Sequence, residues 1–220
     1  MPLALGDVWT SVAGAPVAFE PPSAGFALSW RALADLHGHG VAFATITHAA
    51  GISSTGDPEL DALLPFDEPY HIPIATARAI AAARARGGRV IAIGTTVVRA
   101  IEDASDARGE VRPGHGVAMQ KVTAATRLKV VDVLLSGVHE PGTSHYELMR
   151  AFTDDETLQA ATAQMTALGY RTHEFGDSVL VSAGARCGVG RSLQRRGELG
   201  GVALHLTQDH AVVDAARGHQ

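Results

Sequence analysis

The stretch RVIAIGTTVVRAIEDA, at residues 89–104, constrains the fold of this chain more than any other. Its first part is rich in apolar and β-branched residues and predicts a buried strand, and its second part repeats apolar residues at helical spacing. Gly94 stands at the junction, where a residue without a side chain permits a tight turn. A buried strand that passes directly into a helix is typical of α/β domains, in which helices cover a parallel sheet.

Segments on both sides of this stretch repeat the alternation of helix and strand. A helix capped by Ser29 is predicted at residues 30–38, a buried strand at residues 41–49 and a second helix at residues 74–88. We therefore expect an α/β fold with a largely parallel sheet flanked by helices. Further elements are predicted downstream: a strand within residues 129–140, helices at residues 142–152 and 155–169, and one or two strands within residues 170–183.

Polar segments separate or follow these elements. Residues 51–73 are predicted to be mostly loop, with a helical turn around Leu60, and residues 103–116 to be a polar connector. From residue 186 the chain is rich in Gly and Arg and lacks periodicity. We therefore divide it into an α/β domain at residues 1–185 and a tail at residues 186–220.

Cysteine content, hydropathy and charge narrow the functional classes. Cys187 is the only cysteine, so neither an intramolecular disulfide nor a cysteine zinc cluster can form, and a reducing compartment fits. No apolar run reaches the roughly 18 residues of a membrane span, and the first residues lack a secretory signal pattern. We therefore expect a cytoplasmic protein without a membrane partner. The formal net charge of −5 argues mildly against a dedicated nucleic-acid binder, because phosphate contacts need Lys and Arg.

The start of the helix after Gly94 is a candidate anion site. Its first backbone N–H groups have no partner within the helix, and the helix dipole is positive there. Thr95 and Thr96 add hydroxyl donors, and Arg99, one turn later, can bind a carboxylate or phosphate with its fork. The alternative is that Thr95 only caps the helix and Arg99 is a surface charge.

A second cluster of titratable residues occupies the stretch SGVHEPGTSHYELMRAF. Ser144 or Thr143 is positioned to cap the helix that begins there. His139 and His145 can transfer protons near neutral pH, and Glu140 lies beside them in the sequence. The alternative is that these titratable residues are polar loop residues without a chemical role.

His48, Ser23 and Gly25 are further candidates. His48 stands near the carboxyl end of the strand predicted at residues 41–49, and this is the edge where open α/β sheets bind ligands. Ser23 and Gly25 belong either to a strained turn that exposes backbone donors or to a simple corner after two prolines. No HExxH or comparable ligand spacing occurs, so no metal site is expected.

Several of these segments together resemble one known family. The segments SAG, TITHAAG, RVIAIGTTVVRAIE, LKVVDVLLSGVHEPGTSHYELMRAF and YRTHEFGDSVLV occur in the order found in the S-adenosylmethionine:tRNA ribosyltransferase-isomerases of queuosine biosynthesis. The resemblance covers residues 17–181, and GTTVVRAIE and KVVD are its most specific parts.

The resemblance implies a transferase and isomerase reaction in tRNA modification. Members of the family transfer the ribosyl part of S-adenosylmethionine to the aminomethyl group of a 7-deazaguanine base at the wobble position of the tRNA anticodon. The ribose rearranges, epoxyqueuosine forms, and adenine and methionine leave. The resemblance therefore implies S-adenosylmethionine as ribosyl donor, tRNA as acceptor and no metal cofactor.

The same resemblance implies roles for the candidate residues. The candidate catalytic residues are His139, His145 and His48: either His139 or His145 would move protons, and His48 would line the same crevice. The implied substrate-binding residues are Ser23, Gly25, Gly94, Thr95, Thr96, Arg99, Glu140, Thr143 and Ser144.

The chain departs from the family pattern in three ways. Family members are longer and carry a small β-barrel inserted in the α/β domain, which we expect to be absent here. The histidine usual after the SAG corner is missing from GFAL, at residues 25–28, and a histidine-rich segment is reduced to Pro69-Tyr70-His71. The loop HEPGTSHYE is more polar than expected. Two alternatives follow: an enzyme that uses S-adenosylmethionine or a nucleoside on a small-molecule acceptor, or a non-catalytic truncated homologue.

Overall fold

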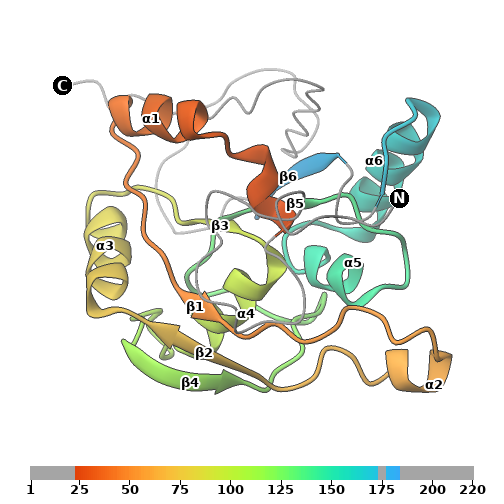
Figure 1. Cartoon of the computed structure of the whole chain (residues 1–220), viewed down its shortest axis with the longest axis horizontal. Coiled ribbons are helices and arrows are strands. Elements are labelled where there is room, and N and C mark those ends of the chain that lie inside the picture. The colour runs from red at the N-terminus through yellow and green to blue at the C-terminus, as the bar shows by residue number, and fades with distance from the viewer. Residues whose placement is uncertain (1–22, 173–176, 184–220) are drawn as a thin grey trace, which may run out of the picture.

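A computed structural model describes residues 23–172 and 177–183, which form two small sheets and several helices (Figure 1). The mixed sheet contains β3 (Ile91–Ile93), β5 (Val133–Gly137) and β6 (Ser178–Ser182), and the antiparallel sheet contains β1 (Thr47–His48), β2 (Glu68–Ile72) and β4 (Gly114–Ala118). The helical elements are η2 (Ser23–Ala27), α1 (Trp30–Gly38), α2 (Pro58–Asp61), α3 (Ile74–Ala85), α4 (Thr95–Asp103), α5 (Ser144–Met149) and α6 (Asp155–Ala167). The predicted tail at residues 186–220 lies outside the described residues, so the division of the chain stays a prediction.

The mixed sheet contains the strands that the sequence predicts. β3 pairs with β5 in parallel, with Ile91 opposite Val133. β5 pairs antiparallel with β6, with Leu134 opposite Val181. The chain between β3 and β5 includes α4, as a crossover between parallel strands requires. The strands predicted in these three parts of the sequence are therefore confirmed.

The antiparallel sheet is the part that the sequence analysis missed. β2 pairs with both β1 and β4, so that Thr47, His71 and His115 lie opposite one another. β2 lies in a segment predicted to be mostly loop, and β4 begins within the predicted polar connector. A proline in β2 and two glycines in β4 hide the strand pattern. The expectation of a largely parallel sheet is wrong, because β3 and β5 are the only parallel pair among the described strands.

The strand predicted at residues 41–49 is wrong in extent and in burial. Only Thr47 and His48 adopt strand conformation, and residues 42–45 are exposed. β1 lies at the edge of the antiparallel sheet, where β2 is its one neighbour among the described strands. The apolar residues before β1 therefore have no strand to pair with and stay irregular.

α4 packs between the two sheets and organises the core. It contacts β3 and β5 of the mixed sheet and β1 and β4 of the antiparallel sheet (Figure 1). Val98, Ala100 and Ile101 on this helix are buried in one cluster with Val131 and Leu134. Because α4 follows β3 directly, this packing fixes the N-terminus of α4 at the carboxyl end of β3.

Tyr70 joins the antiparallel sheet to the end of α4. Its hydroxyl donates to Asp103 Oδ2 at 2.8 Å, and burial together with this hydrogen bond raises the pKa of Tyr70 to about 12. The Tyr70 ring lies over Gly116 on β4, where a Cβ atom would clash with the hydroxyl oxygen and the ring. Glycine at residue 116 is therefore required for this contact.

Glu102, near the end of α4, fixes the chain as it enters β5. Its carboxylate accepts hydrogen bonds from the backbone N–H of Lys129 at 2.7 Å and from those of Val130 and Val131 at 2.9 Å. The Glu102 residue is only 4% exposed. A buried carboxylate satisfied by three backbone donors holds the core strand to the central helix.

The predicted helices are confirmed. The Ser29 hydroxyl accepts a hydrogen bond from the backbone N–H of Ala32 at 3.1 Å and caps α1, as expected. Asp154 caps α6, and the helical turn expected around Leu60 is α2. In the described parts of the chain, no helix combines the length and the apolar character needed to cross a membrane.

Candidate functional site

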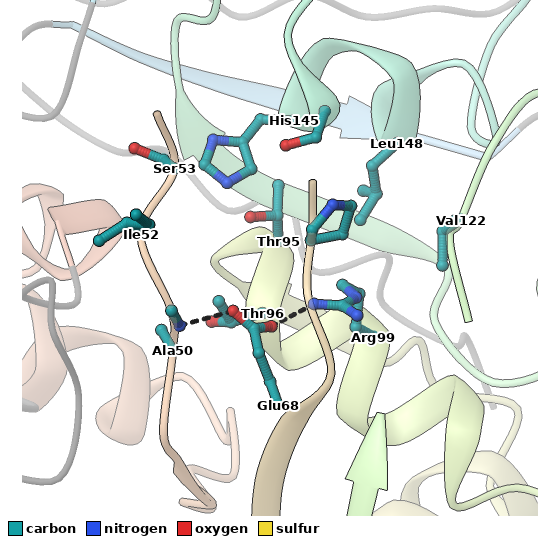
Figure 2. Close-up of a pocket in the computed structure, with 13 residues that line it drawn as sticks. Ala50, Ile52, Ser53, Glu68, Thr95, Thr96, Arg99, Val122, His145 and Leu148 are labelled. Atoms are coloured by element: carbon teal, nitrogen blue, oxygen red, sulfur yellow. Dashed lines mark hydrogen bonds and ion pairs between the residues drawn. The ribbon is translucent and has the colours of Figure 1, made fainter. Parts of the chain in front are cut away.

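A pocket lies where the N-terminal ends of α4 and α5 approach β2 (Figure 2). It brings together Thr95, Thr96 and Arg99 of α4 with Ser144 and His145 of α5, which are far apart in the sequence. The rest of its wall is formed by Ala50, Gly51, Ile52, Ser53, Pro65, Glu68, Val122 and Leu148. Members of two clusters that the sequence analysis singled out therefore line one pocket.

The N-terminus of α4 has a geometry that suits an anion. Gly94 adopts a φ of +96° at the turn from β3 into the helix, a conformation that favours glycine. Gly94 is also the N-cap residue, and no side chain caps the helix, so the alternative in which Thr95 is the cap is wrong. Thr95 is buried, and both threonines line the pocket. The first N–H groups of α4 and the helix dipole favour a negative charge here.

η2 packs against this turn. The Ala24 side chain lies 3.8 Å from the position that a Cβ atom on Gly94 would occupy. Ser23 and Gly25, also on η2, therefore lie close to the start of α4, but neither lines the pocket. Their assignment to substrate binding stays a prediction.

The Arg99 side chain is buried, and its fork is occupied within the protein. Its Nη1 donates to Glu68 Oε2 (Figure 2). Its Nη2 donates to the carbonyls of Phe66 at 3.0 Å and Ala118 at 2.9 Å, and its Nε donates to the carbonyl of Gln120 at 3.3 Å. Arg99 is therefore not a surface charge, and the anion that it binds in the structure is the Glu68 carboxylate. A direct contact of Arg99 with substrate stays a prediction.

Glu68 lines the pocket, although the sequence analysis did not select it. The residue is 6% exposed, and its Oε1 accepts a hydrogen bond from the backbone N–H of Gly51 at 2.7 Å. Its Oε2 accepts from Arg99. One signal was available in the sequence: Glu68, Tyr70 and Ile72 alternate on one face of the strand, and this places a charge on its buried face.

His48 lies behind Glu68, on the neighbouring strand β1. Its side chain is 6% exposed and its Nε2 is 3.7 Å from Glu68 Oε2, and neither ring nitrogen has a hydrogen-bond partner among the described residues. Burial, helped by the charge of Arg99, lowers the pKa of His48 from 6.5 to about 4, so the ring is neutral at neutral pH. His48 does not line the pocket itself. It lies against Glu68, which forms part of the pocket wall.

The start of α5 forms the opposite end of the pocket. Thr143 is the cap of this helix: its hydroxyl accepts from the backbone N–H of Tyr146 at 3.2 Å and donates to the Glu140 carbonyl at 2.9 Å. Ser144 is the first residue of the helix and lines the pocket. The exposed Glu140 carboxylate accepts from the hydroxyl of Thr172 at 3.0 Å and does not line the pocket.

The two histidines of the α5 region are in contact. The ring centroids of His139 and His145 are 4.5 Å apart, with an angle of 57° between the ring planes. His139 Nε2 lies 2.9 Å from Oγ of Ser136, a buried residue of β5 that the sequence analysis did not select. His145 lines the pocket (Figure 2), and His139, which contacts the His145 ring, is not part of the pocket wall. A proton carrier at the pocket therefore has a second titratable group beside it.

The pocket combines a helix N-terminus that favours an anion, a buried carboxylate–guanidinium pair and an imidazole. Within residues 23–172 and 177–183, no three His, Cys, Asp or Glu side chains come together as a metal site would require. This arrangement suits a small ligand that carries both negative and positive charge.

Comparisons with known proteins agree with the resemblance seen in the sequence. The chain matches the family described as queuosine biosynthesis protein over residues 8–181. An S-adenosylmethionine:tRNA ribosyltransferase-isomerase of Sorangium cellulosum is 42% identical over 179 residues, which cover 78% of this chain and 47% of that protein. The protein of the same name from Thiobacillus denitrificans is 37% identical over 176 residues, which cover 78% of this chain and 51% of that protein.

A solved structure has a similar fold. The crystal structure of S-adenosylmethionine tRNA ribosyltransferase from Thermotoga maritima superposes with a TM-score of 0.58 at 26% sequence identity. The superposition covers 71% of this chain and 50% of that chain. The chain thus spans about half the length of the curated relatives it matches.

Proposed function

Because the chain belongs to the queuosine biosynthesis protein family, we propose that it acts in tRNA modification as an S-adenosylmethionine-dependent transferase and isomerase. In the proposed reaction, the ribosyl group of S-adenosylmethionine is transferred to the aminomethyl group of a 7-deazaguanine base in tRNA. The transferred ribose rearranges to give epoxyqueuosine, and adenine and methionine leave. The names of the two curated relatives support this assignment.

The joint pocket of α4 and α5 supports this proposal most directly. It lies within the stretch that matches the family and combines the two clusters of candidate residues. We assign the methionine carboxylate of the donor to the N-terminus of α4, where Gly94 forms the turn and Thr95 and Thr96 line the pocket. Helix N–H groups and hydroxyls bind a carboxylate well in such a place.

We assign proton transfer to the histidines at the other end of the pocket. His145 lines the pocket and is placed to exchange a proton with a bound ligand, and His139 contacts it from behind. His48 stays a further catalytic candidate, in contact with Glu68. The roles of Ser144, Thr143 and Glu140 are binding and positioning around the start of α5.

tRNA is the proposed acceptor, and a cytoplasmic location belongs to the same proposal. A chain with a formal net charge of −5 needs a local cluster of Lys and Arg to hold tRNA phosphates. Binding through such a cluster weakens with added salt, because phosphate contacts release counterions. A gel-shift titration at two salt concentrations measures this dependence.

Adenine release from S-adenosylmethionine tests the proposed function. We expect release that depends on tRNA bearing the 7-aminomethyl-7-deazaguanine base, and none with tRNA that has guanine at the same position. Release without tRNA would point to a small-molecule acceptor or water. No release by protein shown to be folded would contradict the proposed activity for this chain.

Two histidine variants show whether the release takes place in this pocket. His145→Gln is expected to lower the rate about a hundredfold, because a positioned general acid or base contributes roughly that much. His115→Gln is the matched control: His115 is exposed on β4 and does not line this pocket, so the rate should not change. Equal rates for both variants would move the chemistry to another site.

A further inference from the structure

We propose that Glu68 forms a cation subsite in this pocket, which takes a positively charged onium centre of the ligand, either a sulfonium or an ammonium. The subsite rests on the proposed function, because it belongs to the same pocket and the same donor. It also assigns a role to a side chain that none of the sequence motifs contains.

The Glu68 carboxylate is buried but retains capacity for a ligand. A carboxylate oxygen can accept two hydrogen bonds. Oε1 accepts one, from the backbone N–H of Gly51 at 2.7 Å, and the side chain lines the pocket. Burying a charge is costly unless a partner or a function compensates it.

Arg99 compensates this charge from inside the protein. Its guanidinium donates to Glu68 and also to three backbone carbonyls, those of Phe66, Ala118 and Gln120. The positive charge of Arg99 is therefore stabilised partly by these three carbonyl dipoles and only partly by the Glu68 carboxylate. The carboxylate therefore keeps part of its attraction for a second cation that enters from the pocket.

His48 does not neutralise the Glu68 carboxylate. Its Nε2 is 3.7 Å from Glu68 Oε2, beyond hydrogen-bond distance, and its ring lies in a buried position without a hydrogen-bond partner among the described residues. A neutral ring at this distance adds no positive charge beside the carboxylate. Arg99 is thus the one permanent cation in contact with Glu68 among the residues that the structure describes.

The charges of the pocket match those of the proposed donor. The N-terminus of α4 favours an anion, and Glu68 lies toward the same end of the pocket, across from His145 (Figure 2). S-adenosylmethionine carries a carboxylate, an ammonium and a sulfonium close together. A carboxylate bound at the start of α4 leaves the cationic groups of the same ligand free to reach Glu68.

Calorimetric binding of three ligands tests the subsite and distinguishes the two onium centres. S-adenosylmethionine has both centres, S-adenosylhomocysteine has only the ammonium, and 5′-methylthioadenosine has neither. Glu68→Gln is expected to weaken S-adenosylmethionine binding about tenfold, the effect of losing one charge-assisted contact. If Glu68 faces the sulfonium, S-adenosylhomocysteine affinity stays unchanged; if it faces the ammonium, both charged ligands weaken and methylthioadenosine does not.

Other outcomes overturn the subsite. Equal loss for all three ligands, or no loss, shows that Glu68 does not recognise charge. Wild-type protein that binds all three ligands without preference for the charged ones overturns the subsite alone. Wild-type protein that is folded but binds none of them overturns the proposed function as well.

Two further variants guard against a folding artefact. Glu68→Asp keeps the charge and is expected to retain part of the preference for the charged ligands. Glu110→Gln makes the same chemical change at an exposed residue and should leave all three affinities unchanged. If Glu68→Gln does not fold, the affinities of the Glu68→Asp variant for the three ligands, each relative to wild type, decide the question.

Discussion

Glu68 on β2 and Glu102 on α4 are both buried, yet they are satisfied in different ways. Glu102 accepts hydrogen bonds from three successive backbone N–H groups at 2.7–2.9 Å. Glu68 accepts one backbone hydrogen bond and one from the Arg99 side chain, and it lines a pocket. Exposed fractions of 4% and 6% do not separate the two residues, but their partners do. Backbone donors hold a carboxylate to the fold, whereas a side-chain partner beside a pocket leaves it available to a ligand.

Glu102→Ala should have the largest effect of the changes considered, and it tests the structural half of this comparison. Removing the carboxylate leaves three backbone N–H groups near the start of β5 without an acceptor, and the loss should be about 4 kcal/mol of unfolding free energy. Urea denaturation followed by circular dichroism measures it. Any S-adenosylmethionine affinity should be unchanged in the folded fraction.

Matched variants show whether the two glutamates differ as expected. Glu110→Ala changes an exposed glutamate and should alter the unfolding free energy by less than about 0.5 kcal/mol. Glu68→Gln should cost about 1 kcal/mol, since Arg99 keeps its three carbonyl partners. Glu102→Gln is the matched change at the other glutamate and should cost more, because one amide oxygen cannot serve three backbone donors. The comparison breaks down if Glu68→Gln destabilises the protein as much as Glu102→Gln does.

Acid should destabilise the protein through His48, which lies beside Glu68. The pKa of His48 is about 4 in the folded protein, below the ordinary histidine value of 6.5 that applies to the unfolded chain, so the unfolded chain binds more protons between these values. Stability therefore rises with pH through this window and is lost as pH falls. Relative to pH 7, the contribution of His48 at pH 4 is a loss on the order of 3 kcal/mol.

A histidine variant isolates this contribution from other titrating groups. The charged groups that face His48 are Glu68 on β2, with Oε2 at 3.7 Å from the His48 Nε2, and Arg99 on α4, whose charge lowers the His48 pKa. His48→Gln cannot take up the proton, so its unfolding free energy should fall less between pH 7 and pH 4 than that of the wild type. Parallel pH profiles for the two proteins would show that the His48 ring is not held neutral by its surroundings.

Arg99→Lys should reduce stability less than Glu102→Ala does, and it should also weaken ligand binding in the pocket. A lysine ammonium cannot reproduce the planar fork that donates to Glu68 and to three carbonyls, so a loss of about 2 kcal/mol is expected. Glu68 keeps a positive neighbour but loses its fixed orientation, and S-adenosylmethionine affinity should fall. Unchanged affinity in calorimetry would mean that Arg99 does not orient Glu68 for the ligand.

The same contrast explains how much could be predicted from the sequence. β3, α4 and β5 are defined by local patterns, namely a buried apolar run, a glycine turn and helical spacing, and the structure confirms them. Thr95, Thr96 and His145 were found in the same way and line one pocket. Local patterns were sufficient wherever the physical cause of an element lies within the element itself.

Long-range contacts account for what was missed. β2 contains a proline and β4 contains two glycines, so these strands are stabilised mainly by pairing with each other and not by their own propensity. Glu68 is paired with Arg99, 31 positions later in the sequence, and both residues line the pocket. The pairing of such distant residues leaves no periodic signal in a single sequence. The one local sign is a charged residue, Glu68, on the buried face of a strand.

Gly51→Ala should have the smallest effect on stability, and it examines the space around Oε1 of Glu68. A Cβ atom on Gly51 would lie 3.4 Å from this oxygen, which is an ordinary contact, and the backbone is not in the left-handed region. The unfolding free energy should therefore change by no more than about 0.5 kcal/mol, because alanine fits and restricts the unfolded chain. The added methyl group occupies space beside the carboxylate, so S-adenosylmethionine affinity should fall while stability does not.

Gly38→Ala is the control for this change, since a Cβ atom there meets nothing within 4 Å and the residue is not in the left-handed region. It should leave S-adenosylmethionine affinity unaltered. If Gly51→Ala also leaves affinity unaltered, the ligand does not approach Oε1 from the side of Gly51, and the cation must meet Glu68 from the side of Thr96 and Arg99. If Gly51→Ala abolishes binding without loss of stability, the ligand fills the space beside Gly51 and Oε1 so closely that one methyl group excludes it. Glu102 offers no equivalent test, because three backbone groups already surround its carboxylate.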